Sequence, residues 1–143
     1  MPDDLPQRKK RADSQVTGLA GELFVAAELL KRGLQTSVTF GNAKSIDLLA
    51  YNPDTKRSFT VQVKSVRTRN AFPISHERVG ENHTYVFVIL NKPDIPVRYF
   101  IVPGSLLANE PDRFTKWFID PKFPGIPPAA LESFENGWHV FHE

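Results

Sequence analysis

The chain has 143 residues, of which 41% are hydrophobic and 24% are charged, with a formal net charge of +2 and a pI near 9.0. These values are typical of one soluble globular domain and exclude a disordered chain. No apolar run approaches the roughly 20 residues that cross a bilayer, the N-terminus lacks the apolar core of a signal peptide, and the absence of cysteine excludes disulfides and thiolate metal sites. A cytoplasmic location without a membrane partner is therefore expected.

Residues 1–15 are polar and predict a flexible basic arm ahead of a single domain over residues 16–143. The arm carries the run Arg8-Lys9-Lys10-Arg11. A solvated tail explains this run, and so does contact with phosphate groups. Lys9 and Lys10 are the candidates for such a contact.

A helix is predicted over residues 18–32. Thr17 is suited to cap its N-terminus and Gly33 to end it. Gly18 and Gly21 weaken helix propensity, which indicates close packing against a strand or loop. The apolar residues that recur at helical spacing are Leu19, Leu23, Ala26, Ala27 and Leu30.

Residues rich in β-branched and aromatic side chains predict strands at 34–40, 46–51, 59–66, 85–90 and 98–102. The first three form a meander, with turns at Gly41-Asn42 and at residues 52–55. Residues 67–83 are expected to form a loop with a short helical turn. Short helices are expected over residues 105–109 and 128–134, and residues 138–141 are expected to pack as a tail.

Three polar side chains on the second and third strands are predicted to share one face of the sheet. Side chains alternate between the two faces of a strand, so Gln62 and Lys64 lie together. Paired residue numbers in an antiparallel hairpin add to a constant, which is 109 for a tip at residues 54–55 and 107 for a tip at 53–54. Both odd sums place Asp47 on the face of Gln62 and Lys64.

This combination is suited to hold Mg²⁺ or Mn²⁺ beside a phosphate. Mg²⁺ prefers oxygen ligands and keeps several waters, so one or two protein oxygens plus the phosphate suffice. Asp47 would supply charge, Gln62 an amide oxygen and Val63 a main-chain carbonyl, while Glu22 on the helix would hold a metal-bound water. Lys64 would orient or deprotonate the attacking water, or neutralise charge on the phosphate. Ion pairing at a strand edge and a solvated sheet face are the alternative explanations.

These residues carry a resemblance to a known family. A Gly-x-x-Gly-Glu opening that ends at Glu22, then Ile46-Asp47, then Gln62-Val63-Lys64 resembles the PD-(D/E)XK nuclease superfamily. This superfamily includes restriction endonucleases, archaeal-type Holliday junction resolvases and some homing endonucleases. The resemblance covers residues 17–66 and implies an α/β restriction-endonuclease-like fold, with a mixed sheet flanked by helices.

The resemblance also implies roles for four residues. Glu22, Asp47 and Gln62 would be catalytic residues at the metal site, and Lys64 would be the catalytic lysine. Two positions depart from the pattern, because Ile46 replaces a proline and Gln62 replaces the usual acidic residue. The second departure removes one negative charge from the metal site and resembles the Gln-x-Lys form of some homing endonucleases.

The sequence therefore predicts a Mg²⁺- or Mn²⁺-dependent endonuclease that hydrolyses the phosphodiester backbone of DNA. Arg67, Arg69 and Arg78 follow the lysine and are candidate phosphate contacts, although solvated loop charges explain them equally well. A specific DNA interface usually buries about 1,000–2,500 Å² of protein, so a homodimer or recognition of DNA structure is expected of so small a domain. The alternative function is a module of the same fold that binds nucleic acid or protein without cleavage.

Overall fold

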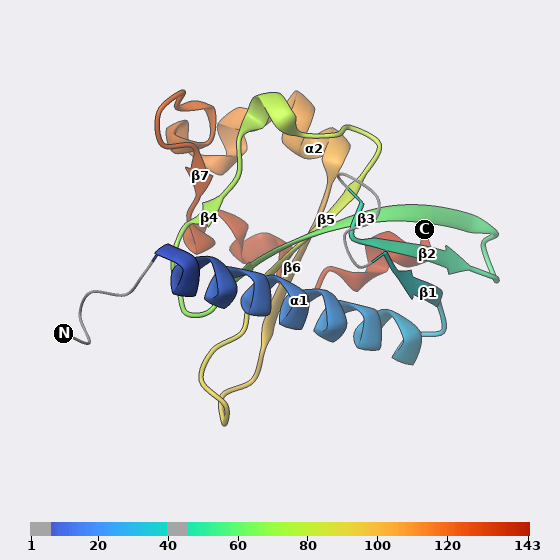
Figure 1. The fold of residues 1–143 in the computed structure, drawn as a ribbon. Coiled ribbons are helices and arrows are strands. Elements are labelled where there is room, and N and C mark those ends of the chain that lie inside the picture. Colours follow the sequence, from blue (N-terminus) through green and yellow to red (C-terminus); the bar gives the residue numbers. More distant parts are fainter. Residues whose placement is uncertain (1–6, 40–45) are drawn as a thin grey trace.

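The computed structural model describes residues 7–39 and 46–143, so the turn expected at Gly41-Asn42 lies outside the described residues. Figure 1 shows one long helix lying along a twisted sheet, with short helices and loops on the other side. The helices are α1 (Gln7–Lys31) and α2 (Gly104–Asn109), with 3₁₀-helices η1 (His76–Arg78), η2 (Pro111–Phe114), η3 (Lys116–Ile119), η4 (Pro128–Phe134) and η5 (Trp138–His142). The strands are β1 (Gln35–Val38), β2 (Leu48–Asn52), β3 (Arg57–Val66), β4 (Phe72–Pro73), β5 (Thr84–Ile89), β6 (Arg98–Pro103) and β7 (Gly125–Ile126).

The main sheet has five strands in the order β1-β2-β3-β5-β6. Strands β1, β2 and β3 form the predicted antiparallel meander, β5 runs parallel to β3, and β6 runs antiparallel to β5. Strands β4 and β7 form a second, two-stranded sheet. This mixed sheet flanked by helices confirms the expected α/β fold class.

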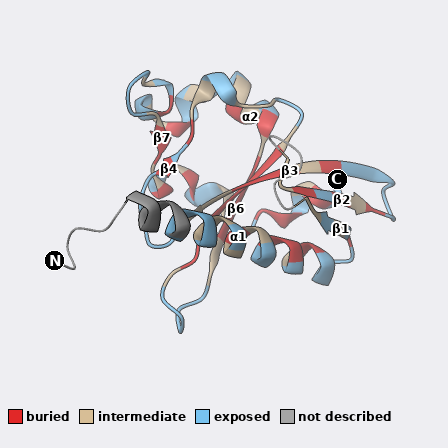
Figure 2. Ribbon diagram, in the orientation of Figure 1, coloured by how far each residue is buried: buried red, intermediate tan, exposed pale blue. Residues whose placement is uncertain are grey.

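Hydrophobic residues are buried on both faces of the main sheet (Figure 2). One core lies between the sheet and α1 with η5, and it includes Val25, Val61, Val86 and Phe141. The other lies between the sheet and the α2, η2, η3 and η4 side. Since β5 is buried along its whole length, its continuous apolar sequence reflects cover on both faces.

Helix α1 begins earlier than its apolar spacing predicts. Residues 7–15, predicted to belong to an extended arm, are helical from Gln7 on, and Thr17 lies inside the helix where the prediction had its cap. This stretch contains arginine, lysine, glutamine and alanine, which are good helix formers. The C-terminal end of α1 was predicted correctly, because Gly33 follows the helix with a φ of +92°, a left-handed conformation that ends a helix. No helix among the described residues has the length and apolar character needed to span a membrane.

The face that α1 turns to the sheet consists of Gly21, Val25 and Leu29, which are buried. A Cβ at Gly21 would collide with the side chain of Ser65 on β3, so the predicted close approach holds at this glycine. Nothing lies within 4 Å of such an atom at Gly18, and the prediction is wrong there. Most of the apolar residues that predict the helix are exposed, and Figure 2 shows exposed positions along the solvent side of α1.

The β2–β3 hairpin has the predicted odd register. Leu48 pairs with Val61, so paired numbers sum to 109, as for a tip at residues 54–55. The side-chain oxygen of Asn52 accepts hydrogen bonds from the N–H groups of Asp54 and Thr55, which sets this turn. The register follows from local turn chemistry.

The second half of the chain is less regular than its patterns suggest. The predicted loop over 67–83 contains β4, which pairs Phe72 with Ile126, as well as η1. The helix predicted over 128–134 is the 3₁₀-helix η4. The predicted C-terminal tail packs as η5, with Trp138 and Phe141 buried in the core.

Candidate active site

Asp47 lies at the bend that leads into β2, opposite Gln62 in the register of the hairpin. Its Oδ2 accepts a hydrogen bond of 2.7 Å from the main-chain N–H of Val63. Strand β2 starts at Leu48, which pairs with Val61, so β2 offers Val63 no backbone partner. The Asp47 carboxylate accepts the hydrogen bond that a neighbouring strand would otherwise accept. It is therefore held at the centre of the Gln62-Val63-Lys64 segment.

Glu22 reaches this point from the other side of the sheet. A helix packed on the polar face of the hairpin would bring Glu22 directly to Gln62 and Lys64, but α1 packs on the face of Val61 and Val63. Glu22 is half-buried on the helix, next to Gly21. Burial, and then the negative charge of Asp47, raise the pKa of Glu22 above its ordinary value. The two carboxylates are therefore close enough to repel each other.

Gln62 and Lys64 lie on the opposite face of β3 from α1, where they line one pocket of about 560 Å³. Gln62 is 8% exposed, and no hydrogen bond joins its amide to another described residue. Lys64 is half-buried and makes no ion pair with a described acidic residue. Because Gln62 lines this pocket, its amide oxygen is available to a ligand there.

The walls of this pocket come from segments far apart in the sequence. Arg78 in η1, Tyr85 on β5, and Lys122 with Phe123 before β7 all line it. The Tyr85 hydroxyl accepts a hydrogen bond from the Gly80 N–H, and burial raises the pKa of this hydroxyl. Sequence reasoning found Arg78 but missed the other three, because no local pattern links them to β3.

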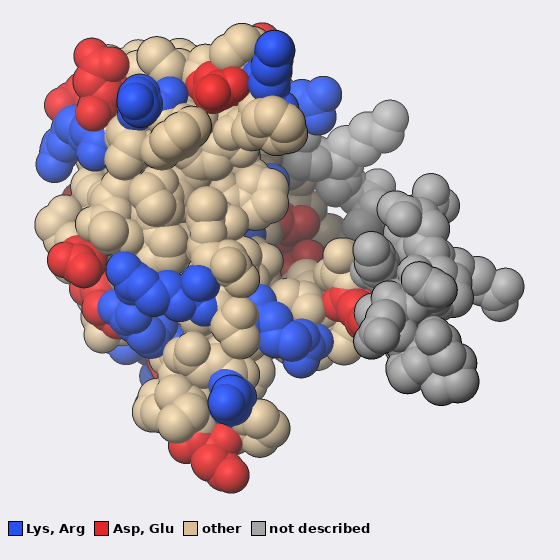
Figure 3. Space-filling view, turned by 90° about the vertical axis from the view of Figure 1, so that its left-hand side faces the viewer, with Lys and Arg blue, Asp and Glu red and all other residues tan. Residues whose placement is uncertain are grey.

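The remaining predicted phosphate contacts differ in their surroundings. Arg67 donates two hydrogen bonds to the Thr17 hydroxyl on α1, so its guanidinium is held against the helix. Arg69 is exposed in the segment after β3. Lys9 and Lys10 lie in the first turns of α1, and their side chains are outside the described part of the chain. Figure 3 shows the side of the molecule that carries β4 and β7, where several groups of lysine and arginine side chains lie among acidic ones around a largely uncharged centre.

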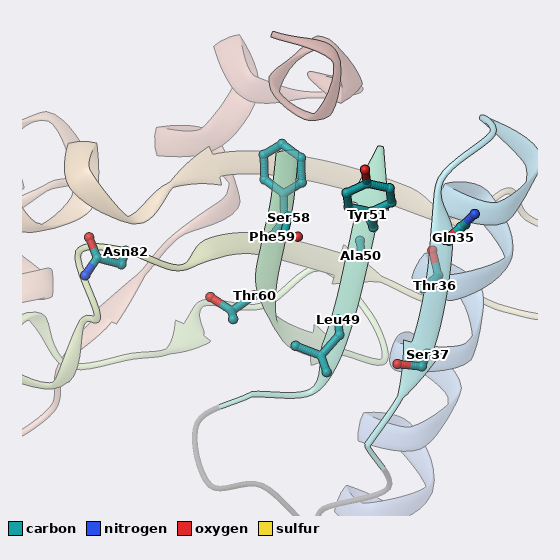
Figure 4. A pocket seen from close by; sticks show the side chains of 10 residues that line it. All are labelled: Gln35, Thr36, Ser37, Leu49, Ala50, Tyr51, Ser58, Phe59, Thr60 and Asn82. Carbon is teal, nitrogen blue, oxygen red and sulfur yellow. The ribbon is translucent and has the colours of Figure 1, made fainter. Parts of the chain in front are cut away.

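The same face of β3 continues into a second, open pocket of about 640 Å³ over β1 and β2. Ser37, Leu49 and Thr60 form one cross-strand row there, as Figure 4 shows. The Thr60 hydroxyl is 2.7 Å from Nδ1 of His83, to which sequence reasoning gave no role. This surface is open and largely apolar, and it adjoins the pocket of Gln62 and Lys64 through β3.

The donor atoms around Val63 fit a hard cation. Asp47 supplies a carboxylate, Gln62 supplies an amide oxygen, and the Val63 carbonyl is expected to point to the same side as its N–H. Glu22 lies on the α1 side of β3, and the charge of Asp47 contributes to its raised pKa. Oxygen donors of this kind suit Mg²⁺ or Mn²⁺ better than zinc. Within the described residues no group of three or more His, Cys, Asp or Glu side chains is placed to hold a metal ion. The fit therefore depends on the neutral oxygens of Gln62 and Val63.

Comparisons with known proteins bear on the fold. No family model and no curated protein matches the sequence. Among solved structures, the chain is similar to the bacterial homing endonuclease I-Ssp6803I, with a TM-score of 0.56 and 16% sequence identity over 88% of this chain and 89% of that chain. At that identity the likeness shows the fold alone. The chain therefore has a nuclease-like α/β fold.

Proposed function

We propose that this chain is a Mg²⁺- or Mn²⁺-dependent DNA endonuclease of the PD-(D/E)XK type. The observation that carries the proposal is the hydrogen bond by which the Asp47 carboxylate holds the main-chain N–H of Val63, between Gln62 and Lys64. Burial, and then the charge of Asp47, raise the pKa of the Glu22 carboxyl on α1. Gln62 and Lys64 flank Val63 on β3. The repulsion between the Glu22 and Asp47 carboxylates lowers the stability of the fold unless a cation offsets it. A purely structural role therefore does not explain why both are present.

Each side chain has a distinct part in this proposal. Asp47 and Gln62 would hold the cation, and the hydrogen bond from Val63 fixes the orientation of the Asp47 carboxylate. Glu22 would hold a metal-bound water. Lys64 extends into the pocket, where its ammonium group stabilises the charge that builds on the phosphate. A bound divalent ion would lower the pKa of a water and neutralise the leaving oxygen.

The surroundings of the pocket suit a DNA backbone. Arg78 and Lys122 line it together with Lys64, so three basic side chains surround a space large enough for a phosphate and its sugar. The I-Ssp6803I structure bears the name of a homing endonuclease, and DNA as the partner is proposed by that analogy. A homodimer would present two such sites to the two strands of a duplex.

Plasmid cleavage tests the proposal directly. Purified protein would be incubated with supercoiled and branched DNA in Mg²⁺, in Mn²⁺ and in EDTA. We expect cleavage only with a divalent cation, and a loss of about 10²- to 10⁴-fold in rate for Lys64→Ala. Lys92→Ala is the matched control, because Lys92 is exposed in the β5–β6 connection. Cleavage that is unaffected by Lys64→Ala and Asp47→Ala would refute the proposed site.

A second candidate function is a binding module that does not cleave. It is favoured by Gln62, which leaves only two carboxylates near Val63 where the superfamily pattern has a further acidic residue. Such a module would bind DNA in a filter or mobility-shift assay and would leave every substrate intact in both metals. Removal of Lys64 would then weaken binding without any effect on strand integrity.

A further inference from the structure

Helix α1 carries an apolar stripe on its outer side. Val16, Leu19, Leu23 and Leu30 are 58%, 43%, 46% and 55% exposed, and the small Ala27 is exposed between them. At 100° per residue these positions cluster on the side of the helix opposite Val25 and Leu29, which face the sheet. The stripe is about 21 Å long from Val16 to Leu30.

This stripe contributes nothing to the core of its own chain. A surface helix usually has one apolar face and one polar face, whereas a helix that is apolar on both sides is buried on both. Charged side chains are present elsewhere on the surface of α1, where Glu28 and Arg32 form an ion pair one turn apart. The helix could therefore have carried charge along the stripe as well. The outer stripe is therefore the mark of a contact with another surface.

The spacing of the stripe is symmetric about Leu23. The positions 16, 19, 23, 27 and 30 are separated by three, four, four and three residues. We propose that α1 pairs with α1 of a second copy of this chain, antiparallel, with the two-fold axis at Leu23. Val16 then packs on Leu30 of the second copy, Leu19 packs on its Ala27, and the two Leu23 side chains meet. Such an isologous contact needs one patch that is complementary to itself.

The flank of the stripe has the same symmetry. Asp13, Ala20, Phe24 and Lys31 lie along one side of it, and their spacing is symmetric about a point within one residue of Leu23. In an antiparallel pair each flank meets the same flank of the other helix. Asp13 then lies beside Lys31 of the second copy, about 3 Å apart along the axis. Both side chains are exposed, and neither forms an ion pair with a described residue.

The pair of charges makes a second copy the best fit for the stripe. Asp13 and Lys31 would attract each other at both ends of the antiparallel pair. In a parallel pair this flank would face the opposite flank of the second copy, so Asp13 and Lys31 would not be brought together. The positions of the charges and the spacing of the apolar residues therefore both favour the antiparallel pair.

Sedimentation velocity tests the pairing over a range of protein concentrations. We expect the unaltered chain to be a dimer, and Leu23→Glu to raise the dissociation constant at least about 30-fold, because two carboxylates would meet at the axis. Leu49→Glu is the matched control, since Leu49 on β2 is also 46% exposed. Thermal unfolding of each variant checks that it is folded. A monomeric unaltered chain, or a Leu23→Glu dimer of unchanged affinity, would overturn the proposal.

Charge reversal and crosslinking test the direction of the helices. Asp13→Lys and Lys31→Asp should each weaken the dimer, and the double variant should restore it. The chain has no cysteine, so Leu23→Cys should oxidise to a crosslinked dimer. Val16→Cys alone should not, but a mixture of Val16→Cys and Leu30→Cys chains should. Efficient crosslinking of Val16→Cys to itself would show parallel helices and refute the antiparallel pair.

Discussion

The Asp47 carboxylate binds the main-chain N–H of Val63, with 2.7 Å between Oδ2 and the nitrogen. This bond joins the residue before β2 to the middle of β3 and satisfies a donor that β2 leaves without a partner. The structure and the proposed chemistry therefore depend on the same carboxylate, and two substitutions separate them.

Asp47→Ala should destabilise the protein by about 1–3 kcal/mol, since it leaves the Val63 N–H without an acceptor. Asp47→Asn keeps an oxygen at this position and should cost less than about 1 kcal/mol, while it removes the charge. Urea unfolding measures both values. If cleavage depends on the charge, both variants lose it. Equal stability losses for the two variants would contradict the role given to the hydrogen bond.

Glu22→Gln should stabilise the metal-free protein at neutral pH. Burial and the charge of Asp47 raise the pKa of Glu22 above its ordinary value of 4.5, so the unfolded chain releases this proton first as the pH rises. The carboxylate therefore contributes nothing below pH 4.5 and destabilises the fold increasingly as the pH rises towards the folded pKa. The gain in melting temperature from Glu22→Gln in EDTA should be small at pH 4 and larger at pH 7.

The Asp47→Asn background provides the control for this pH dependence. Without the charge of Asp47, only burial raises the pKa of Glu22, so the gain from Glu22→Gln should shrink. A gain of the same size at every pH would show that Glu22 titrates alike in the folded and unfolded chains.

Gln62→Glu should make the protein depend more strongly on a divalent cation. The change adds a buried carboxylate opposite Asp47 in the hairpin register, so it should lower the melting temperature in EDTA. With Mg²⁺ present the added charge should strengthen binding, and each tenfold gain in affinity adds about 1.4 kcal/mol of stability at saturating metal. Thermal shifts with and without Mg²⁺ measure this. A metal-induced shift no larger than that of the unaltered chain would contradict the proposed ligand role of Gln62.

Gly21→Ala and Gly18→Ala should have opposite effects although they lie one helical turn apart. A methyl group at Gly21 runs into Ser65, whereas at Gly18 it meets nothing within 4 Å. Gly21→Ala should cost about 1–3 kcal/mol through overpacking, and Gly18→Ala should add about 0.5–1 kcal/mol. Ser65→Gly should rescue Gly21→Ala, because it clears the obstructing side chain. Chemical unfolding of the three variants and the double variant completes the test.

Thr115→Gly should raise the melting temperature. Thr115 lies between η2 and η3 with φ of 84° and ψ of 160°, a conformation that only glycine adopts readily. Its hydroxyl is also buried without a hydrogen-bond partner. Glycine removes both the backbone strain and the unpartnered hydroxyl. This should outweigh the entropic cost of glycine and raise the free energy of unfolding by about 1 kcal/mol. Thr115→Ala keeps the strained backbone and should gain less; an equal gain would assign the effect to the hydroxyl.

Local patterns predicted the hairpin well and the packing of α1 poorly. The Asn52 turn and the alternation along β3 are properties of neighbouring residues, so they fixed the register that sets Asp47 opposite Gln62. Helical spacing showed that α1 is a helix but not which of its two apolar sides faces the sheet. The side of Gly21, Val25 and Leu29 is buried because glycine admits β3 closely.

Long-range pairing accounts for what the sequence did not reveal. Strand β4 has only two residues and pairs with β7 across more than fifty positions, which leaves no periodic signal. The same connection brings Lys122 and Phe123 to the pocket of Lys64. The residue types on one strand can suggest a chemistry. The residues that form the walls of the pocket around that strand depend on the topology of the whole chain.

The two neighbours of β3 differ in their distance along the chain, and this has a consequence for how the protein is made. Strand β2 is joined to β3 by a tight turn, whereas β5 follows only after the segment that holds β4 and η1. Because short loops close at lower entropic cost than long ones, the hairpin is expected to form during synthesis before β5 has left the ribosome. Glu22 and Asp47 would then meet while one side of β3 is still open to water.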